Sequence, residues 1–334
     1  MARFIVRRLL WLIPTLLVLS FLLFAWLRSL PGGPSAAMLG DRATPEKVAA
    51  LNRALGLDQS IPVQYLRFLG RILSGDFGTS VASKRPVIRE VADAFPATIE
   101  LSVAALLFAI GLGIPLGYLA ARRRAGILDN ATIIGTLAGV SVPVFFLGYL
   151  AQDMFASGLG WLPVSGRVTA GLGQTEVTGF VVLDAVLTRE WEVLGDALRH
   201  LALPAIVLGT IPLAVIVRIT RASVLDVVNE DYVRTAEAKG LQVRTIRGRH
   251  ILRNALLPVS TTIGLQTGLL LSGAILTERV FNWGGLGSLL AEGINRRDYP
   301  RLQALILMIA VVYVLVNLLV DISYAIIDPR VRVR

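Results

Sequence analysis

The sequence predicts an all-α integral membrane protein: a six-helix polytopic transmembrane bundle with an external subdomain between spans one and two. The 334 residues are 54% hydrophobic and only 17% charged, whereas soluble domains carry about 25% charged residues. Six long stretches contain no Asp, Glu, Lys or Arg. The cations, which exceed the acids by 33 to 23, gather beside alternate ends of these stretches. Together these features place the chain in a bilayer.

Each uncharged stretch is 18 to 24 residues long. A helix needs about 20 residues to cross a hydrocarbon core roughly 30 Å thick. The alternative, a large soluble protein with buried helices, does not account for six such stretches in one chain. The predicted spans are 9–27, 101–121, 130–152, 200–217, 254–277 and 302–320.

The distribution of arginine predicts the orientation. Arginine clusters precede span one, follow span two and end the chain, and cations outnumber acids eight to four between spans four and five. The connector 153–199 instead holds three arginines and six acids. Because cytoplasmic loops carry the excess of Lys and Arg, we expect both termini and the connector after span four to be cytoplasmic. The connector 28–100 is too long for this rule.

Three regions follow from the spans. Residues 1–28 form the N-terminal tail and span one, residues 29–96 form the external subdomain, and residues 97–334 form a core of spans two to six. That core includes a cytoplasmic loop at 218–257 and an external loop at 153–199. A cleavable signal peptide is the alternative for the N-terminus, since Ser35-Ala36-Ala37 follows an arginine-flanked apolar run. The length of that run favours a retained span.

Most catalytic and cofactor chemistry lacks candidate residues. With no cysteine, the chain has no thiolate metal site and no thiol nucleophile. Its three lysines follow Glu46, Ser83 and Ala238, so no Gly-Lys pair can end a phosphate-binding loop. The two histidines, His200 and His250, are predicted on opposite sides of the membrane. We therefore expect no enzyme activity and no cofactor in this chain.

Two other function classes are also disfavoured. Nucleic-acid binding is not expected, because the arginines cluster by membrane side and are not interleaved with aromatic residues. Ion-coupled carriers generally bury an ionisable group within the bilayer, and the six stretches contain none. Asp153 and Asp321 lie at span ends, where we expect them at the membrane interface rather than in an ion-binding site. The chain thus resembles a pathway whose energy comes from a partner.

Glycine and proline indicate how the spans pack. The pairs Gly113/Gly117, Gly135/Gly139 and Gly264/Gly268 have the spacing that allows close helix approach. Proline kinks or breaks a helix, and five prolines lie in or near the spans. They are Pro14, Pro115, Pro143, Pro204 and Pro212.

The connector after span four predicts a helical projection. The pattern continues as helix from span four to Gly240, a C-cap signal. A second helix is expected at about 243–257, ending at Pro258 where span five begins. A solvated amphipathic loop would have the same pattern.

The residues of this loop resemble those of a known family. The segments DYVRTAEAKGL at 231–241 and RHILRNALLP at 249–258 resemble the cytoplasmic signature loop of ABC importer membrane subunits. More narrowly, they resemble the first permease of dipeptide, oligopeptide and nickel importers. Similar matches run along the whole chain. They are RRLL at 7–10, LPGGP at 30–34, LGLDQSIPVQY at 55–65, GDFG at 75–78, VFNWGGLG at 280–287 and RDYP at 297–300.

The resemblance implies the type I importer permease fold in a bacterial inner membrane. It also implies that the helix before Gly240 docks in a cleft of a separate ATPase subunit that holds ATP and Mg²⁺. In the general importer motif the opening triplet is Glu-Ala-Ala, where this chain has Arg234-Thr235-Ala236, so no glutamate-specific contact is carried over. Val233, Ala236, Ala238 and Leu241 would form the packed face. The full expected coupling set is Val233, Arg234, Thr235, Ala236, Glu237, Ala238, Lys239, Gly240, Leu241 and His250.

The resemblance further implies four partners: a second homologous permease, two ATPases and an extracytoplasmic substrate-binding protein received by 28–100 and 153–199. Gln266, Thr267 and Asn317 are candidates for the substrate pathway, with helix packing as the alternative. The cargo would be di- or oligopeptides. Nickel, glycosides or another solute remain open within the family, and an ATP-independent carrier or channel remains open outside it.

Overall fold

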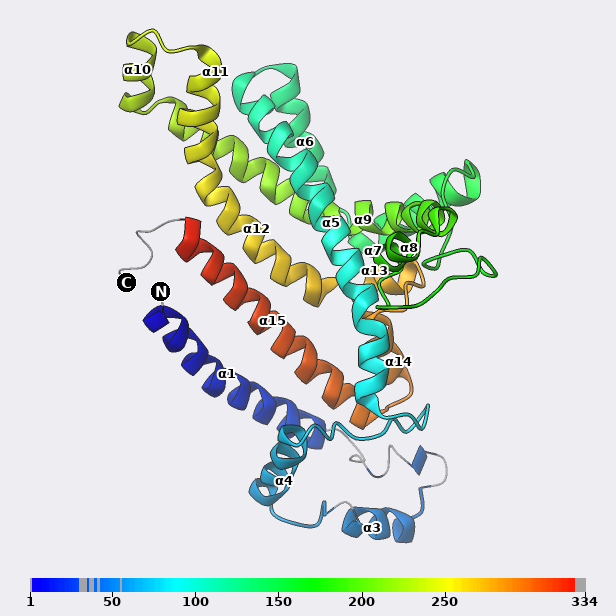
Figure 1. Ribbon diagram of the computed structural model, residues 1–334. Helices are drawn as coiled ribbons and strands as arrows, with labels where there is room; N and C mark the ends of the chain where they lie inside the picture. Colours follow the sequence, from blue (N-terminus) through cyan, green and yellow to red (C-terminus); the bar gives the residue numbers. More distant parts are fainter. Residues whose placement is uncertain (1, 30–34, 36–38, 41–42, 55, 328–334) are drawn as a thin grey trace.

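The computed structural model describes residues 2–29, 35, 39–40, 43–54 and 56–327 (Figure 1). Several sequence features lie outside these residues: the LPGGP segment at 30–34, Ala36 and Ala37 of the possible cleavage site, Leu55, and the carboxyl-terminal arginines. The described residues are predominantly helical. Their only β feature is an isolated antiparallel bridge between Thr79 and Pro86.

Sixteen helical segments follow one another along the described chain. They are α1 (Ala2–Ser29), α3 (Pro45–Ala54), α4 (Ile61–Leu73), α5 (Val87–Arg122), α6 (Ile127–Ser141), α7 (Val144–Ala151), the π-helical η2 (Gln152–Gly158), α8 (Val181–Thr188), α9 (Trp191–Val228), α10 (Asp231–Ala238), α11 (Val243–Thr245), the π-helical η3 (Ile246–Leu252), α12 (Arg253–Gly273), α13 (Ile275–Val280), α14 (Leu286–Asn295) and α15 (Tyr299–Ile327).

The all-α membrane class is confirmed, but the count of six spans is not. Among the described residues, three helices are long and apolar enough to cross a bilayer, within α5, α9 and α15. A fourth span results if α6 and the helix after it, bent by 102°, are taken together. Spans one and five correspond to α1 and α12, and within α1 the described residues contain a shorter apolar helix, Leu10–Trp26.

Helices α5 and α9 form the most extensive contact in the molecule, and glycine explains their close approach. A Cβ on Gly117 would lie 2.6 Å from the Val217 carbonyl oxygen, and one on Gly113 would lie 2.8 Å from Ile216. The predicted packing role of this glycine pair is confirmed. For Gly135 and Gly139 no such contact is found within the part of the chain that the structure describes, because nothing there lies within 4 Å of either added Cβ.

The prolines act differently from one another. Pro143 separates α6 from α7, with Val142 before it extended at φ −87° and ψ 126°, as expected for a residue that precedes proline. The other four lie inside the continuous helices α1, α5 and α9. Only Pro143 therefore produces the helix break that the sequence suggested.

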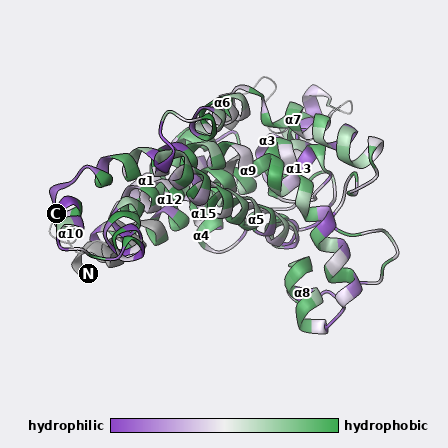
Figure 2. Ribbon diagram, turned by 90° about the horizontal axis from the view of Figure 1, so that it is seen from above, coloured by the Kyte–Doolittle hydropathy of each residue, from purple (hydrophilic) through white to green (hydrophobic). Residues whose placement is uncertain are grey.

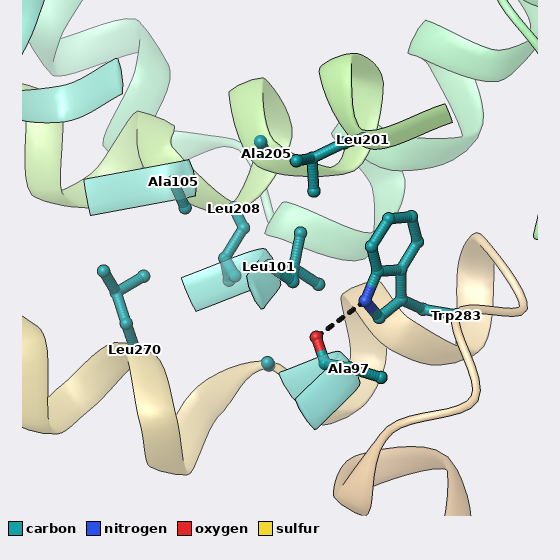
Figure 3. Close-up of a cluster of buried hydrophobic side chains, with 9 residues drawn as sticks. Ala97, Leu101, Ala105, Leu201, Ala205, Leu208, Leu270 and Trp283 are labelled. Atoms are coloured by element: carbon teal, nitrogen blue, oxygen red, sulfur yellow. Dashed lines mark hydrogen bonds between the residues drawn. The ribbon is translucent and has the colours of Figure 1, made fainter. Parts of the chain in front are cut away.

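A buried cluster joins α5, α9 and α12 to the segment after α13 (Figure 3). Its largest member, Trp283, donates a hydrogen bond of 2.8 Å from Nε1 to the Ala97 carbonyl oxygen. The carboxylate of Glu278, which is fully buried, accepts hydrogen bonds from Thr98 Oγ1 and the Ser288 backbone N–H. These bonds hold α13 and the start of α14 against α5.

The described part of 29–96 packs on the bundle through α4. Phe24 of α1 stacks on Phe68 of α4 with ring centroids 5.6 Å apart, and both belong to a core cluster that includes Leu307 of α15. The expected boundary at residue 96 also falls inside α5. In Figure 1, α3 and α4 lie at the end of the bundle opposite α10.

Candidate functional site

The helical turn around Gly240 projects from one end of the bundle. Figure 1 shows α10 and α11 beyond the end of α12, and Figure 2 shows hydrophilic residues around α10 and apolar residues along the long helices. Helix α10 is separate from α9. The single helix expected as far as Gly240 is therefore wrong, because α9 ends at Val228 and Glu230 is extended, with φ −72° and ψ 143°.

Gly240 ends α10 in a left-handed conformation, with φ +71°. Its N–H donates to the Glu237 carbonyl oxygen at 2.9 Å, and the Leu241 N–H donates to the Ala236 carbonyl oxygen at 3.2 Å. This pair of bonds is the Schellman motif, which favours glycine because it has no Cβ. The C-cap predicted from the sequence is confirmed, and it gives the projection a defined turn.

The apolar face of α10 points into its own chain. Val233 and Ala236 are 2% and 4% exposed and belong to a cluster with Val224 of α9 and with Ile246 and Ile251 of η3. Assigning these two residues to a partner-facing surface was therefore wrong. A short solvent-exposed helix stays folded only if its apolar side is covered, and here α9 and η3 cover it.

The opposite face of α10 is open to solvent. The exposed expected residues are Arg234, Thr235, Glu237, Ala238, Lys239, Gly240 and Leu241. The guanidinium of Arg234 makes only a long contact, 3.8 Å, with the carboxylate of Asp231. This surface therefore presents positive and negative side chains and the small Ala238 to a partner. It also presents Leu241, which is 41% exposed.

The second limb of the projection is more irregular than expected. Residues 243–257 pass from α11 through the π-helical η3 into α12, and α12 continues through Pro258 rather than ending there. His250 lies on η3, partly buried and apart from the exposed face of α10. The Asn254 Nδ2 donates to Tyr232 Oη at 3.0 Å, which links α12 to α10.

An ion pair that the sequence did not reveal connects the neighbouring helices. Arg221 of α9 donates from Nη2 to Asp129 Oδ2 of α6 at 2.8 Å, and its Nε donates to the other carboxylate oxygen. Asp129 is 1% exposed and also accepts the Ala125 N–H. Because the residues are 92 positions apart, their charges gave no signal of pairing.

The three substrate-pathway candidates do not form one site. Gln266 lines a cavity of about 480 Å³ between α7, α9, α12 and α13. Thr267 does not line it, and its Oγ1 donates to the Ile263 carbonyl oxygen within α12. Asn317 of α15 lies against Gly268, with Oδ1 3.1 Å from the position of an added Cβ. Thr267 and Asn317 therefore support helix structure and packing.

A bundle of apolar helices with a helical projection at one end is the architecture of a multi-pass membrane protein, and comparison with known proteins identifies its type. The family described as "Binding-protein-dependent transport system inner membrane component" matches residues 113–333. The corresponding amino-terminal family matches residues 1–102. The chain belongs to this family of ABC importer permeases, which confirms the resemblance seen in the sequence.

The relatives are similar over their full length. The chain is 46% identical to the di/tripeptide transport system permease protein DppB of Pseudomonas aeruginosa, covering 99% of each chain. It is equally similar to the dipeptide transport system permease protein DppB of Escherichia coli, again over 99% of each. The glutathione transport system permease protein GsiC of Salmonella paratyphi A is 39% identical, with 99% covered in both. The chain is thus a multi-pass inner-membrane transport component that works with ABC transporter partners such as an ATPase and a binding protein.

Proposed function

We propose that this chain forms half of the pathway through which dipeptides enter the cell. A substrate-binding protein delivers them, and two separate ATPase subunits supply the energy. The observation that carries the proposal is 46% identity, over 99% of both chains, to one permease named for di/tripeptide transport and one named for dipeptide transport. The second half of the pathway is a similar permease.

We further propose that the exposed face of α10 docks on an ATPase subunit. Its apolar face is covered by α9 and η3, so movement of the ATPase is transmitted to α9 and α12 through packed side chains. The Schellman turn at Gly240 and the bond from Asn254 to Tyr232 hold the docking helix rigid. Rigid-body transmission of this kind is one established way of switching between two states.

The docking surface can be tested without disturbing the fold. Ala238→Trp adds a large side chain on the exposed face, and we expect the ATPases to be lost on co-purification while the permease still inserts in the membrane. Glu176→Trp, at an exposed position in the external loop, is the control and retains the ATPases. Full ATPase recovery with Ala238→Trp would contradict docking through this face.

The cargo and energy source need a transport assay. The complete complex in liposomes, with the binding protein outside and ATP inside, is expected to accumulate a labelled dipeptide only when ATP is present. Accumulation of nickel or a glycoside instead of the dipeptide would show that the transported solute is not a peptide. Uphill transport by this chain alone without ATP would establish a carrier.

The proposed orientation places both termini and α10 in the cytoplasm. Because the chain contains no cysteine, a single introduced thiol is the only site for maleimide labelling. In intact cells stripped of the outer membrane, Glu176→Cys is expected to react with an impermeant maleimide and Lys239→Cys only after the inner membrane is opened. The reverse pattern would invert the orientation.

A further inference from the structure

Helix α6 is held at its start by a buried ion pair with α9. The Asp129 carboxylate lies in the first turn of α6 and is 1% exposed. It accepts two hydrogen bonds from the Arg221 guanidinium and a third, of 2.9 Å, from the Ala125 N–H in the connector between α5 and α6. A bidentate pair fixes the relative orientation of its two groups as well as their distance. The start of α6 is therefore fixed to one position on α9.

Arg221 lies on the part of α9 that also carries the projection. Val224, three residues further along, belongs to the buried cluster with Val233 of α10 and Ile246 of η3. The contact of α9 with α6 and its contact with α10 are therefore less than one helical turn apart. In Figure 1, α5 passes into α6 at the end of the bundle that carries α10. A displacement of α10 that moves this end of α9 consequently moves Arg221.

Beyond the ion pair, α6 packs loosely. Nothing in the described part of the chain lies within 4 Å of a Cβ added to Gly135 or Gly139, and Ile134 and Leu137 are 66% and 60% exposed. The hydroxyl groups of α6 donate to carbonyl oxygens of α6 itself. The ion pair is therefore the main polar contact by which α6 can follow a movement of α9.

The far end of α6 leads to a second region of tight packing. After the break at Val142 and Pro143, α7 approaches the end of α13 so closely that a Cβ on Gly148 would lie 3.1 Å from Val280 and 3.4 Å from Phe281. The break itself turns the chain by 102°. Hinges are commonly a few residues at the ends of helices or strands. A shift of Arg221 relative to α13 would therefore change the angle at this break.

We propose that Asp129 and Arg221 are a positioning pair that makes α6 move with α9 when an ATPase subunit displaces α10. The pair transmits the displacement to the break before α7, where the angle between α6 and α7 changes. The inference rests on the proposed function and extends its transmission route from α10, through the end of α9, to α6. Neither residue is catalytic, because each acts through the helix that carries it.

A pair that only stabilises the fold would have a different effect from one that transmits movement. Loss of a purely structural pair lowers the amount of working complex, so ATP hydrolysis and peptide import fall together. Loss of a transmitting pair leaves the ATPases active while fewer peptides enter for each ATP consumed. The measurement is therefore the number of labelled dipeptides imported per ATP hydrolysed by the complete complex in liposomes.

Two arginines of α9 provide matched variants. Arg221→Gln removes the ion pair, and we expect dipeptide import per ATP to fall about tenfold, within the range for substitutions along a coupling route. Arg218→Gln, one turn earlier at an exposed position of α9, should leave this ratio within about twofold of wild type. Because Arg221→Gln leaves a buried carboxylate without its counterion, which can destabilise α6, a second variant removes both charges.

Asp129→Cys combined with Arg221→Cys leaves no unpaired charge and supplies the only two thiols of the chain, which contains no cysteine. With the thiols reduced, we expect this variant to hydrolyse ATP but to import about tenfold fewer dipeptides per ATP. A short bis-thiosulfonate joins the two thiols and replaces the ion pair with a covalent link. We expect the link to return the ratio to near the wild-type value. The wild-type complex treated with the same reagent controls for thiols of the other subunits.

Three results would overturn the proposal. One is a wild-type ratio in the reduced double-cysteine variant, and another is a ratio that the cross-link does not restore. The third is a proportional loss of import and hydrolysis, or loss of the assembled complex, in both Arg221→Gln and the double-cysteine variant, which would make the pair purely structural. Failure of the wild-type complex to import a dipeptide with ATP would instead reject the proposed function.

Discussion

Arg301 at the start of α15 forms a bidentate ion pair with Glu90 at the start of α5, with N–O distances of 2.7 and 2.9 Å. The two side chains are only 3% and 6% exposed. Arg301 also donates to Glu292 of α14 at 3.1 Å. One guanidinium therefore joins three helices at the end of the bundle that carries α4.

Removing this guanidinium is expected to destabilise the protein strongly. Arg301→Met leaves the Glu90 carboxylate buried without a counterion, a change that typically costs about 3–5 kcal/mol. Arg296 provides the control, since it also pairs with Glu292 but at the surface, with 58% and 41% exposure. Arg296→Met should cost about 0–1 kcal/mol. Thermal unfolding in detergent measures both, and equal shifts in Tm would contradict the assigned role of Arg301.

Close packing between α5 and α9 predicts a different outcome for two similar glycines. Gly117→Ala places a Cβ against the Val217 carbonyl oxygen and Thr220, whereas Gly135→Ala enters open space. We expect Gly117→Ala to cost about 1–3 kcal/mol through overpacking. Gly135→Ala should be neutral or slightly stabilising, because alanine is the better helix former. Unfolding midpoints compare the two variants, and a larger loss for Gly135→Ala would reverse the packing assignment.

The sequence located the long helices but not their ends. Residues inside the hydrocarbon core of a bilayer must be apolar, so an uncharged stretch marks the membrane-embedded part of a helix. The uncharged stretch 101–121 accordingly lies inside α5. Yet α5 begins at Val87, because Arg89, Glu90 and Asp93 can extend a helix beyond the apolar stretch. Pro258 likewise did not end α12, since an interior proline can be accommodated within a membrane helix.

The local turn at Gly240 was predictable, and the direction of the helix before it was not. A glycine C-cap is a property of a few neighbouring residues. By contrast, whether Val233 and Ala236 face a partner or their own chain depends on where α9 and η3 pass, which is a long-range packing result. The Asp129–Arg221 pair was missed for the same reason.

The sequence also does not show which of two neighbouring residues lines the cavity, Gln266 or Thr267. Gln266 and Thr267 are adjacent and both polar, but successive residues point about 100° apart around a helix. Only the rotation of α12 against α9 and α15 determines which one reaches the cavity. Nothing in the local sequence around either residue reports that rotation.

Backbone conformation at Gly240 can be tested with a matched glycine. Neither Gly240 nor Gly248 has any atom within 4 Å of an added Cβ, and only Gly240 has a positive φ. Gly240→Ala is therefore expected to cost about 1–2 kcal/mol locally and to weaken ATP-driven transport, while Gly248→Ala leaves transport intact. Gly240→Asn should be intermediate, because asparagine tolerates this conformation. Equal transport by both alanine variants would show that the turn geometry is unimportant.

The burial of Ala236 can be tested with a charged substitution, because the carboxylate of Ala236→Asp would lie in the cluster with Val224 and Ile251 and disrupt the projection. An unpaired buried charge is among the most destabilising changes, so we expect α10 and η3 to become sensitive to protease in Ala236→Asp. Ala238→Asp, on the exposed face, should remain resistant, and similar cleavage of both would contradict the burial of Ala236.

The segment that leads into α8 is held by a carboxylate whose ionisation stabilises it. Asp184 of α8 is fully buried, which raises its pKa. Hydrogen bonds from the Thr178 hydroxyl and from the N–H groups of Val177, Thr178 and Gly179 outweigh this, so the pKa lies below its usual value. Because the depressed pKa belongs to the folded state, this stabilisation is complete above the unfolded pKa of about 4. It is lost as the pH falls through the folded value.

Hydrogen exchange across 177–184, corrected for the intrinsic rate, is therefore expected to remain slow at pH 7 and to accelerate below about pH 4. The side chain of Asp184→Asn cannot ionise. Its NH₂ group is a hydrogen-bond donor and would face the backbone N–H groups of Val177, Thr178 and Gly179, which are donors too. In that variant the amides of 177–184 should exchange rapidly at pH 7, and their corrected exchange rate should not rise further on acidification. If the wild-type segment exchanged at the same corrected rate at pH 3 and pH 7, ionised Asp184 would not be what holds the loop in place.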